Sequence, residues 1–152
     1  MQKITTFLWF NQEAEEAMNF YTSVFANSGI LSLVRNGDRV VSGTFQLEGQ
    51  TFMALNGGPH YTFTPAISLF VSCESQEEVD ELWEKLVEGG EESRCGWLKD
   101  RFGLSWQIIP KALGELMHGG GDAARAQRVM NAMLGMNRII IEDLKRAYEG
   151  EG

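Results

Sequence analysis

The stretch CGWLKDRFGLSWQIIP, residues 95–110, carries the strongest fold signal in the chain. Short strands fit residues 97–102 and 104–109, and strand alternation in the second run places Ser105 and Gln107 on one face. Three charged residues towards the end of the first run, Lys99 to Arg101, are interpreted as a solvated hairpin tip. The alternative is that Lys99 or Arg101 meets an anionic group of a ligand.

The residues before this stretch repeat an order of elements. A strand is predicted at 66–73, a helix follows with Val79, Leu82, Trp83 and Leu86 on one side, and another strand fits 91–95. Ser75 and Glu78 form a capping box at the helix start. The first half predicts the same order, with a strand at 4–10, a helix at 14–25, and strands near 30–35, 39–47 and 51–56.

The sequence therefore predicts an α+β fold of two βαβββ modules, about 1–57 and 64–110, within a single domain spanning 1–152. A unit that recurs in this way buries against its copy, so two half-sheets are expected to enclose a cavity. A helical tail over about 111–150 follows, in which Asp122 is expected to cap a helix. The tail is too apolar to be exposed to solvent, so we expect it to pack either on its own sheet or on a second subunit.

Composition excludes several classes of function. The formal net charge of -8 argues against a nucleic-acid or anionic-membrane surface, because phosphate binding needs clustered Lys and Arg. No apolar run reaches the roughly 20 residues that span a bilayer. Two cysteines, Cys73 and Cys95, are too few for a disulfide framework, and no signal peptide is recognisable. A cytoplasmic protein with free thiols is expected.

Several motifs together resemble a known family. They are FY at 20–21, LNGGP at 55–59, CGWLKDRFGLSWQIIP at 95–110 and AQRVMNAMLGMNRI at 126–139. With the repeated βαβββ order, they resemble the PhnB-like branch of the vicinal oxygen chelate superfamily, which includes glyoxalase I, extradiol dioxygenases, and fosfomycin and bleomycin resistance proteins. The resemblance covers almost the whole chain, and GWLKDRFGLSWQ is its most specific part. It implies a glyoxalase/bleomycin-resistance-like pair of half-barrels and a homodimer.

The resemblance also identifies the positions at which metal-using members hold a divalent ion. They correspond here to Thr5 or Thr6, Ala54, Ala66 and Gln107. Divalent transition metals need imidazole, thiolate or carboxylate donors, so these side chains are not expected to hold one. We expect no metal and no cofactor, and the metal-dependent chemistry of the superfamily does not carry over.

The remaining question is what fills the cavity. Strand alternation predicts eight side chains on the concave face: Phe7, Trp9, Phe52, Asn56, Ser68, Phe70, Ser105 and Gln107. An apolar, aromatic lining with a few polar tips is typical of a small-molecule pocket. The alternative is that these side chains only fill a packed core.

The leading hypothesis is a metal-independent small-molecule-binding protein, with no nucleic-acid or membrane partner. The alternative is an enzyme acting on a small oxygenated substrate, with His60 as acid or base or in an unconventional metal site with Glu48 or Asp100. A third is an interaction module with a Met-rich tail. Members of the branch often carry the label 3-demethylubiquinone-9 3-methyltransferase. Methyl transfer is not expected, because no GxGxG-type turn follows a strand.

Overall fold

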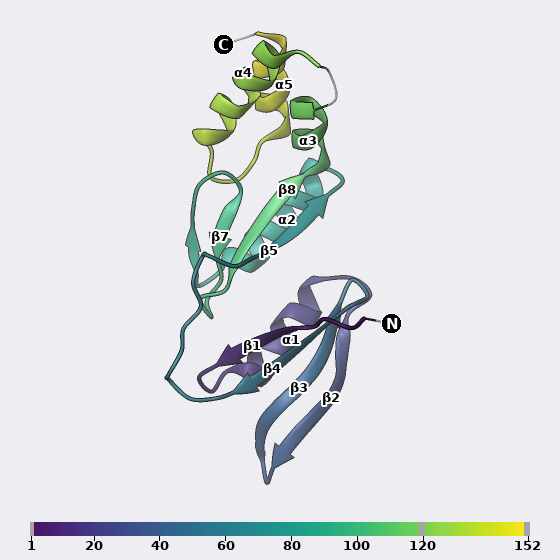
Figure 1. Ribbon diagram of the computed structural model, residues 1–152, viewed down its shortest axis with the longest axis vertical. Coiled ribbons are helices and arrows are strands. Elements are labelled where there is room, and N and C mark those ends of the chain that lie inside the picture. The colour runs from purple at the N-terminus through teal and green to yellow at the C-terminus, as the bar shows by residue number, and fades with distance from the viewer. Residues whose placement is uncertain (1, 119–120, 151–152) are drawn as a thin grey trace. The chain divides into compact units, whose positions relative to one another are not determined.

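Each half of the chain forms a four-stranded sheet with one helix against it, as the computed structural model shows for residues 2–118 and 121–150 (Figure 1). The first half contains β1 (Thr6–Phe10), α1 (Ala14–Val24), β2 (Gly29–Asn36), β3 (Arg39–Leu47) and β4 (Gln50–Asn56). The second contains β5 (Ser68–Cys73), α2 (Gln76–Val87), β6 (Glu91–Glu92), β7 (Trp97–Lys99) and β8 (Ser105–Pro110). The tail forms α3 (Lys111–His118), α4 (Ala123–Leu134) and α5 (Ile141–Glu149).

The two sheets have the same topology. Their strand orders are β1-β4-β3-β2 and β5-β8-β7-β6. In each, the first strand pairs in parallel with the fourth, and the other pairs are antiparallel. The predicted α+β fold of two βαβββ modules followed by helices is confirmed. The chain divides into two compact units, Met1–Phe63 and Thr64–Gly152.

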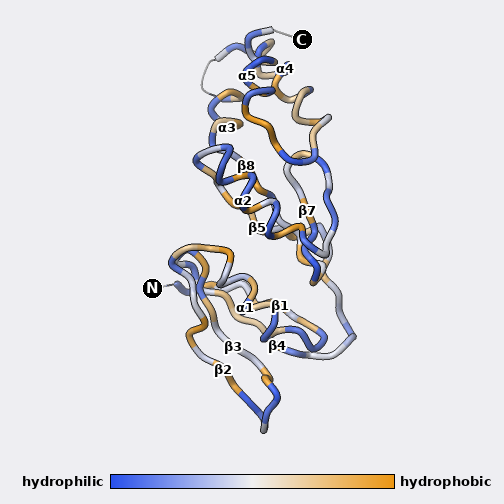
Figure 2. Tube along the Cα trace, turned by 180° about the vertical axis from the view of Figure 1, so that it is seen from behind, coloured by the Kyte–Doolittle hydropathy of each residue, from blue (hydrophilic) through white to orange (hydrophobic). Residues whose placement is uncertain are grey.

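Helix α1 buries one face of the first sheet. Its apolar side chains Ala17, Met18 and Tyr21 are at most 1% exposed. Tyr21 stacks on Phe45 at 6.3 Å between ring centroids. Residues two apart on a strand point to the same face, and Phe45, Phe52 and Ala54, which face α1, are at most 6% exposed. Hydrophobic residues, drawn in orange, recur along the strands of this sheet in Figure 2.

Helix α2 buries the corresponding face of the second sheet. Its core side chains Val79, Leu82, Trp83 and Leu86 are those the helical spacing predicted. The predicted cap is also present, because the Ser75 hydroxyl accepts a hydrogen bond from the Glu78 N–H at 3.2 Å.

Two predicted strands in the second unit are shorter than expected. The run at 91–95 pairs only over Glu91–Glu92, and the run at 97–102 only over Trp97–Lys99. The first gives way to a turn, in which the Trp97 N–H donates to the Arg94 carbonyl at 3.1 Å and Cys95 and Gly96 have left-handed φ values of 60° and 83°. The second ends at Asp100, whose side chain organises a turn.

The tail packs on its own unit, the first of the two placements that the sequence left open. The backbone N–H groups of Cys95 and Gly96 donate to the carbonyls of Met136 and Asn137 at 2.8 and 2.7 Å. Ile109 at the end of β8 joins a buried cluster with tail residues, namely Leu113, Val129, Ile139 and Leu144. Asp122 caps α4 as predicted, accepting from the N–H groups of Ala124 and Arg125. Among the described helices, none is long and apolar enough to cross a bilayer.

Candidate functional site

The open face of the first sheet, opposite α1, carries two of the predicted site residues. Phe7 and Trp9 point to this face, where the strand register aligns them with Met53 and Leu55 of β4. Phe7 is 48% exposed. An aromatic side chain held out from a sheet in this way is available to a ligand or to another protein surface.

Phe52 and Asn56 do not share this face, so their predicted placement beside Phe7 and Trp9 is wrong. Phe52 aligns with Thr6, is 6% exposed and stacks on Phe45 at 5.4 Å. Asn56 faces the same side and bonds the start of α1. The physical reason is that β4 has apolar residues on both of its faces, Phe52 and Ala54 on one and Met53 and Leu55 on the other. Alternation alone therefore does not determine which of the two faces packs against α1.

Asn56 holds three elements of the first unit together. Its side-chain oxygen accepts from the Ala14 N–H at 2.8 Å, and its amide nitrogen donates to the Val40 carbonyl at 3.0 Å. The first bond caps α1, because Glu13 at the N-cap position makes no side-chain cap bond. Asn56 is therefore a structural residue of the LNGGP motif.

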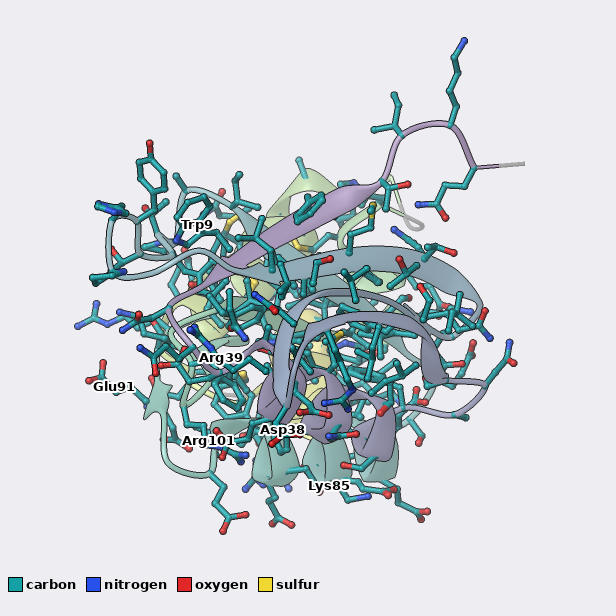
Figure 3. The ribbon with its side chains drawn as sticks, turned by 90° about the horizontal axis from the view of Figure 1, so that it is seen from below. Trp9, Asp38, Arg39, Lys85, Glu91 and Arg101 are labelled. Carbon is teal, nitrogen blue, oxygen red and sulfur yellow. The ribbon has the colours of Figure 1, made fainter. Side chains whose placement is uncertain are left out.

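The same motif positions Trp9, which is labelled in Figure 3. The indole N–H donates to the Gly58 carbonyl at 3.0 Å, and Tyr61 meets the ring edge-on at 4.8 Å. A Cβ at Gly57 would lie 2.3 Å from the indole, so only glycine allows this contact. Trp9 is fixed in place by the segment after β4 and is partly covered by it.

The open face of the second sheet brings together the other predicted residues. Ser68, Phe70 and Gln107 share it, with Phe70 aligned to Gln107 across the β5–β8 pair. The Gln107 amide donates to the Ser68 hydroxyl at 2.9 Å. Ser105 is on the same face but is 3% exposed and lines a separate small hollow of about 180 Å³ with Pro65 and Lys99. Three of these four side chains thus form one cluster.

A slot lies where this face meets the tail, and we call it the C-terminal slot. Its volume is about 390 Å³, within the range of ligand pockets. The sheet wall is formed by side chains of β5, β7 and β8: Phe70, Ser72, Trp97, Gln107 and Ile109. The helix wall comes mainly from α3 and α4: Leu113, Gly114, Met117, His118 and Met133. The slot is apolar apart from a few polar groups on its walls.

Gln107 is the polar group at the sheet wall. Among residues 2–118 and 121–150, its side chain bonds only Ser68, so one end of the amide is left for a ligand. Because a serine hydroxyl both donates and accepts, the amide can turn either its oxygen or its NH₂ toward the slot. Gln107 can therefore orient either a hydrogen-bond donor or an acceptor.

Two further groups at the slot are charged or nucleophilic. Lys111 forms an ion pair and hydrogen bond with Glu74, which raises the pKa of Lys111 and keeps it cationic. Cys95 lines the slot and is partly exposed. Cys73 is different, because burial raises the pKa of its thiol to about 12, with a smaller contribution from Glu78. Cys73 is a protonated core residue rather than a nucleophile.

Asp100 is not part of a solvated hairpin tip, and that prediction is wrong for this residue. Asp100 is 2% exposed. One carboxylate oxygen accepts from the N–H groups of Phe102 and Leu104 at 2.9 and 3.1 Å, and the other accepts from the Trp106 indole at 2.9 Å. Both carboxylate oxygens are therefore engaged in the turn between β7 and β8. This engagement argues against the alternative in which Asp100 binds a metal ion together with His60.

The superfamily metal site does not fit this chain. Thr5 precedes β1, Thr6 and Ala54 face α1 rather than the open face, and Ala66 precedes β5 in a turn. Of the implied positions, Gln107 on the open face offers an amide, which is a poor donor for a divalent transition metal. Within the described parts of the chain, His, Cys, Asp and Glu side chains form no group of three or more suited to a metal.

Sequence reasoning missed the helix wall of the slot. Two methionines of the tail, Met117 and Met133, both pack against the buried cluster around Leu113 and line the slot. Their role in lining the slot follows from how the tail docks, and no local pattern reports that. Gly114 did give a signal, because a glycine in the middle of a helix is unusual.

Comparisons with known proteins agree with this geometry. The family model described as 3-demethylubiquinone-9 3-methyltransferase matches residues 2–109. The PhnB protein from Bacillus cereus, described under the same methyltransferase name, is 43% identical, with 72% of this chain and 99% of that chain covered and a TM-score of 0.68. No curated protein sequence matches the chain.

Two more distant structures share the fold. A protein from Pseudomonas aeruginosa is 20% identical, with 72% of this chain and 98% of that chain covered and a TM-score of 0.64. The fosfomycin resistance protein FosX from Listeria monocytogenes, complexed with Mn(II) and sulfate, is 15% identical, with 70% and 89% covered and a TM-score of 0.51. The resemblance predicted over almost the whole chain is confirmed for residues 2–109, the segment that the family model matches.

Proposed function

Because the chain belongs to the 3-demethylubiquinone-9 3-methyltransferase family, the PhnB-like branch of the vicinal oxygen chelate superfamily, we propose that it binds a small molecule without a metal ion. The observation that carries the proposal is the Gln107–Ser68 pair on the open face of the second sheet, 2.9 Å apart beside Phe70. An amide with one free end beside aromatic surface orients a ligand but does not activate one.

The proposal separates binding from metal-assisted catalysis. A metal in this superfamily would act as a Lewis acid on substrate oxygens, and the side chains at the corresponding positions here are a poor donor set. Purified without chelator, the protein is expected to carry no stoichiometric zinc, iron, manganese or nickel by elemental analysis. A stoichiometric metal would overturn the metal-independent part of the proposal.

The family name suggests methyl transfer, and the local structure argues against it. A nucleotide-type cofactor site needs a glycine-rich turn between a strand and the following helix. Here β1 and α1 are joined by Asn11, Gln12 and Glu13, and β5 and α2 by Glu74 and Ser75. We therefore expect S-adenosylmethionine to show no binding by isothermal titration calorimetry. Saturable binding at micromolar concentration would contradict this expectation.

Ligand binding itself is tested through Gln107. A fragment library screened by saturation-transfer NMR is expected to give hits whose signals weaken in the Gln107→Leu variant. Gln127→Leu is the matched control, because Gln127 lies on an exposed face of α4 and bonds only Asn131 among the described side chains. Equal binding by wild type and Gln107→Leu would remove Gln107 as the orienting group.

We also propose that the protein is a cytoplasmic homodimer. The exposed apolar side chains of the first unit, Phe7, Leu31 and Val34, support an interface there, since they are between 48% and 56% exposed. The free thiols Cys73 and Cys95 support a reducing compartment. Light scattering is expected to give twice the chain mass at micromolar concentration, and a monomer would count against the dimer.

A further inference from the structure

The helix wall of the C-terminal slot lies outside the segment that the family model matches. That segment ends at residue 109, and α3 begins at Lys111. The slot therefore combines a sheet wall belonging to the matched fold with a helix wall added by the tail. Any ligand selectivity that depends on the helix wall is a property of the tail rather than of the matched region.

The segment that joins α4 to α5, directly after the helix wall, is bonded to the second sheet and to α2. Besides the backbone bonds at Cys95 and Gly96, the Gln76 side chain at the start of α2 donates to the Ile139 carbonyl at 3.0 Å and accepts from the Ile141 N–H at 2.7 Å. Arg138 lies 3.5 Å from Asp80 and 3.7 Å from Glu84. The helix wall itself is anchored by the buried cluster in which Leu113 of α3 and Val129 of α4 pack with Ile109 of β8, and such support is what selective binding requires.

Gly114 lies in the helix wall of the slot, at a position where glycine lowers the stability of the helix. It is the fourth residue of the eight-residue helix α3, where alanine would be the better helix former. Packing does not require glycine here, because no atom lies within 4 Å of the Cβ that an alanine would add. Its φ is not in the left-handed region, so the backbone does not require glycine either. Gly114 is exposed and lines the slot, so an added methyl group would project into open space at this wall.

The side chains that line the slot indicate which class of ligand it favours. Phe70 and Trp97 line it from the sheet, and Met117 and Met133 from the helices. Thioethers and aromatic side chains both make favourable contacts with a ring, through sulfur–aromatic and ring–ring interactions. Gln107 adds a single polar contact. This combination favours a flat aromatic molecule over an aliphatic one of the same size.

We propose that the helical tail makes the slot a binding site for an aromatic ring that bears one amide-like or carboxyl-like group. Gly114 remains a glycine because a side chain there would reduce the room for the ring. The ring lies between Phe70 and Trp97 on one side and Met117 and Met133 on the other, and its polar group meets Gln107. This inference rests on the proposed function for the role of Gln107 and adds the ligand class and the helix wall.

The first test uses two amides that differ in the ring. Benzamide and cyclohexanecarboxamide are titrated into protein labelled with ¹³C at its seven methionine methyl groups. Benzamide is expected to shift the Met117 and Met133 methyl signals upfield through its ring current and to bind more tightly than cyclohexanecarboxamide. Met117→Leu and Met133→Leu assign the signals. Shifts confined to Met53, on the open face of the first sheet, would overturn the placement.

The second test separates stability from binding at Gly114. Gly114→Ala is expected to raise the thermal midpoint by about 2 to 4 °C, because alanine stabilises the helix. The same variant is expected to weaken benzamide binding about tenfold, since a single methyl group in an apolar site changes affinity by that order. Gly29→Ala is the matched control, because it also adds a methyl group with no atom within 4 Å, but in the other unit.

The outcomes distinguish the inference from the proposed function. A Gly114→Ala variant that is stabilised but binds benzamide as wild type does would overturn the inference, because the glycine would then reserve no ligand space. If benzamide fails to bind while other fragments still depend on Gln107, the aromatic class is wrong and the proposed function stands. If no fragment depends on Gln107 either, both fail.

Discussion

Replacing Asp100 with alanine is expected to destabilise the second unit severely, although the residue lies in a charged hairpin connection. The carboxylate accepts from two buried donors, the Leu104 N–H and the Trp106 indole N–H. Each donor left without a partner costs about 1 to 3 kcal/mol, so the two together cost about 2 to 6 kcal/mol. The third donor, the partly buried Phe102 N–H, can turn to water. A loss of this size is a large part of the roughly 5 to 15 kcal/mol that stabilises a typical domain.

Asp100→Asn tests the geometry more finely. The asparagine oxygen can still accept from Phe102 and Leu104, but its NH₂ group faces the Trp106 indole N–H, so one bond is lost at a cost of about 1 to 3 kcal/mol. Trp106→Phe removes that donor. In the Trp106→Phe background, Asp100→Asn is therefore expected to cost less, and the double-mutant cycle should show a coupling energy of about 1 to 3 kcal/mol.

Urea denaturation followed by circular dichroism measures both effects, with the m-value checked because the chain has two compact units. Asp38→Asn is the control, since Asp38 is an exposed acidic residue in the turn between β2 and β3 (Figure 3). It is expected to change stability by less than about 0.5 kcal/mol. An Asp100→Ala variant as stable as this control, or a coupling energy of zero, would refute the argument.

Two other predictions follow from contacts that sequence reasoning missed. Asn56→Ala removes the cap of α1 and the bond to Val40, so it should lower the free energy of unfolding by about 1 to 3 kcal/mol in the same urea assay, whereas exposed Asn131→Ala should change it little. For Cys73, the folded pKa of about 12 exceeds the ordinary value of 9.0, so its stabilising contribution is complete below pH 9 and is lost as the pH rises towards 12. Urea midpoints measured between pH 8 and 11 should therefore fall more steeply for wild type than for Cys73→Ala, and parallel slopes would contradict the shift.

The sequence predicted the parts of the fold that rest on local patterns. The duplication, the order of elements and the caps at Ser75 and Asp122 follow from periodicity and from residue types with strong positional preferences. The face of β5 and β8 was also predictable, because Ser68 and Gln107 are polar residues that alternate with buried apolar ones, such as Trp106.

Features that depend on tertiary docking were not predictable in this way. In β4, residues of both parities are apolar, so the set that faces α1 is chosen by packing against Phe45 and Tyr21. The burial of Asp100 depends on Trp106 reaching back across the hairpin. The C-terminal slot exists because the segment at Met136 and Asn137 pairs with Cys95 and Gly96, residues about 40 positions earlier, which no local signal encodes.

In the motif GWLKDRFGLSWQ, the residues that pack the fold and the residues that line the slot are different. Leu98 and Trp106 point towards α2, and Asp100 ties Trp106 to the turn. Trp97 and Gln107 point the other way and line the slot. Because alternate residues of a strand face opposite sides, one set can keep the fold while the other changes with the ligand. Likeness in this segment therefore supports the shared fold more strongly than a shared reaction or a shared ligand.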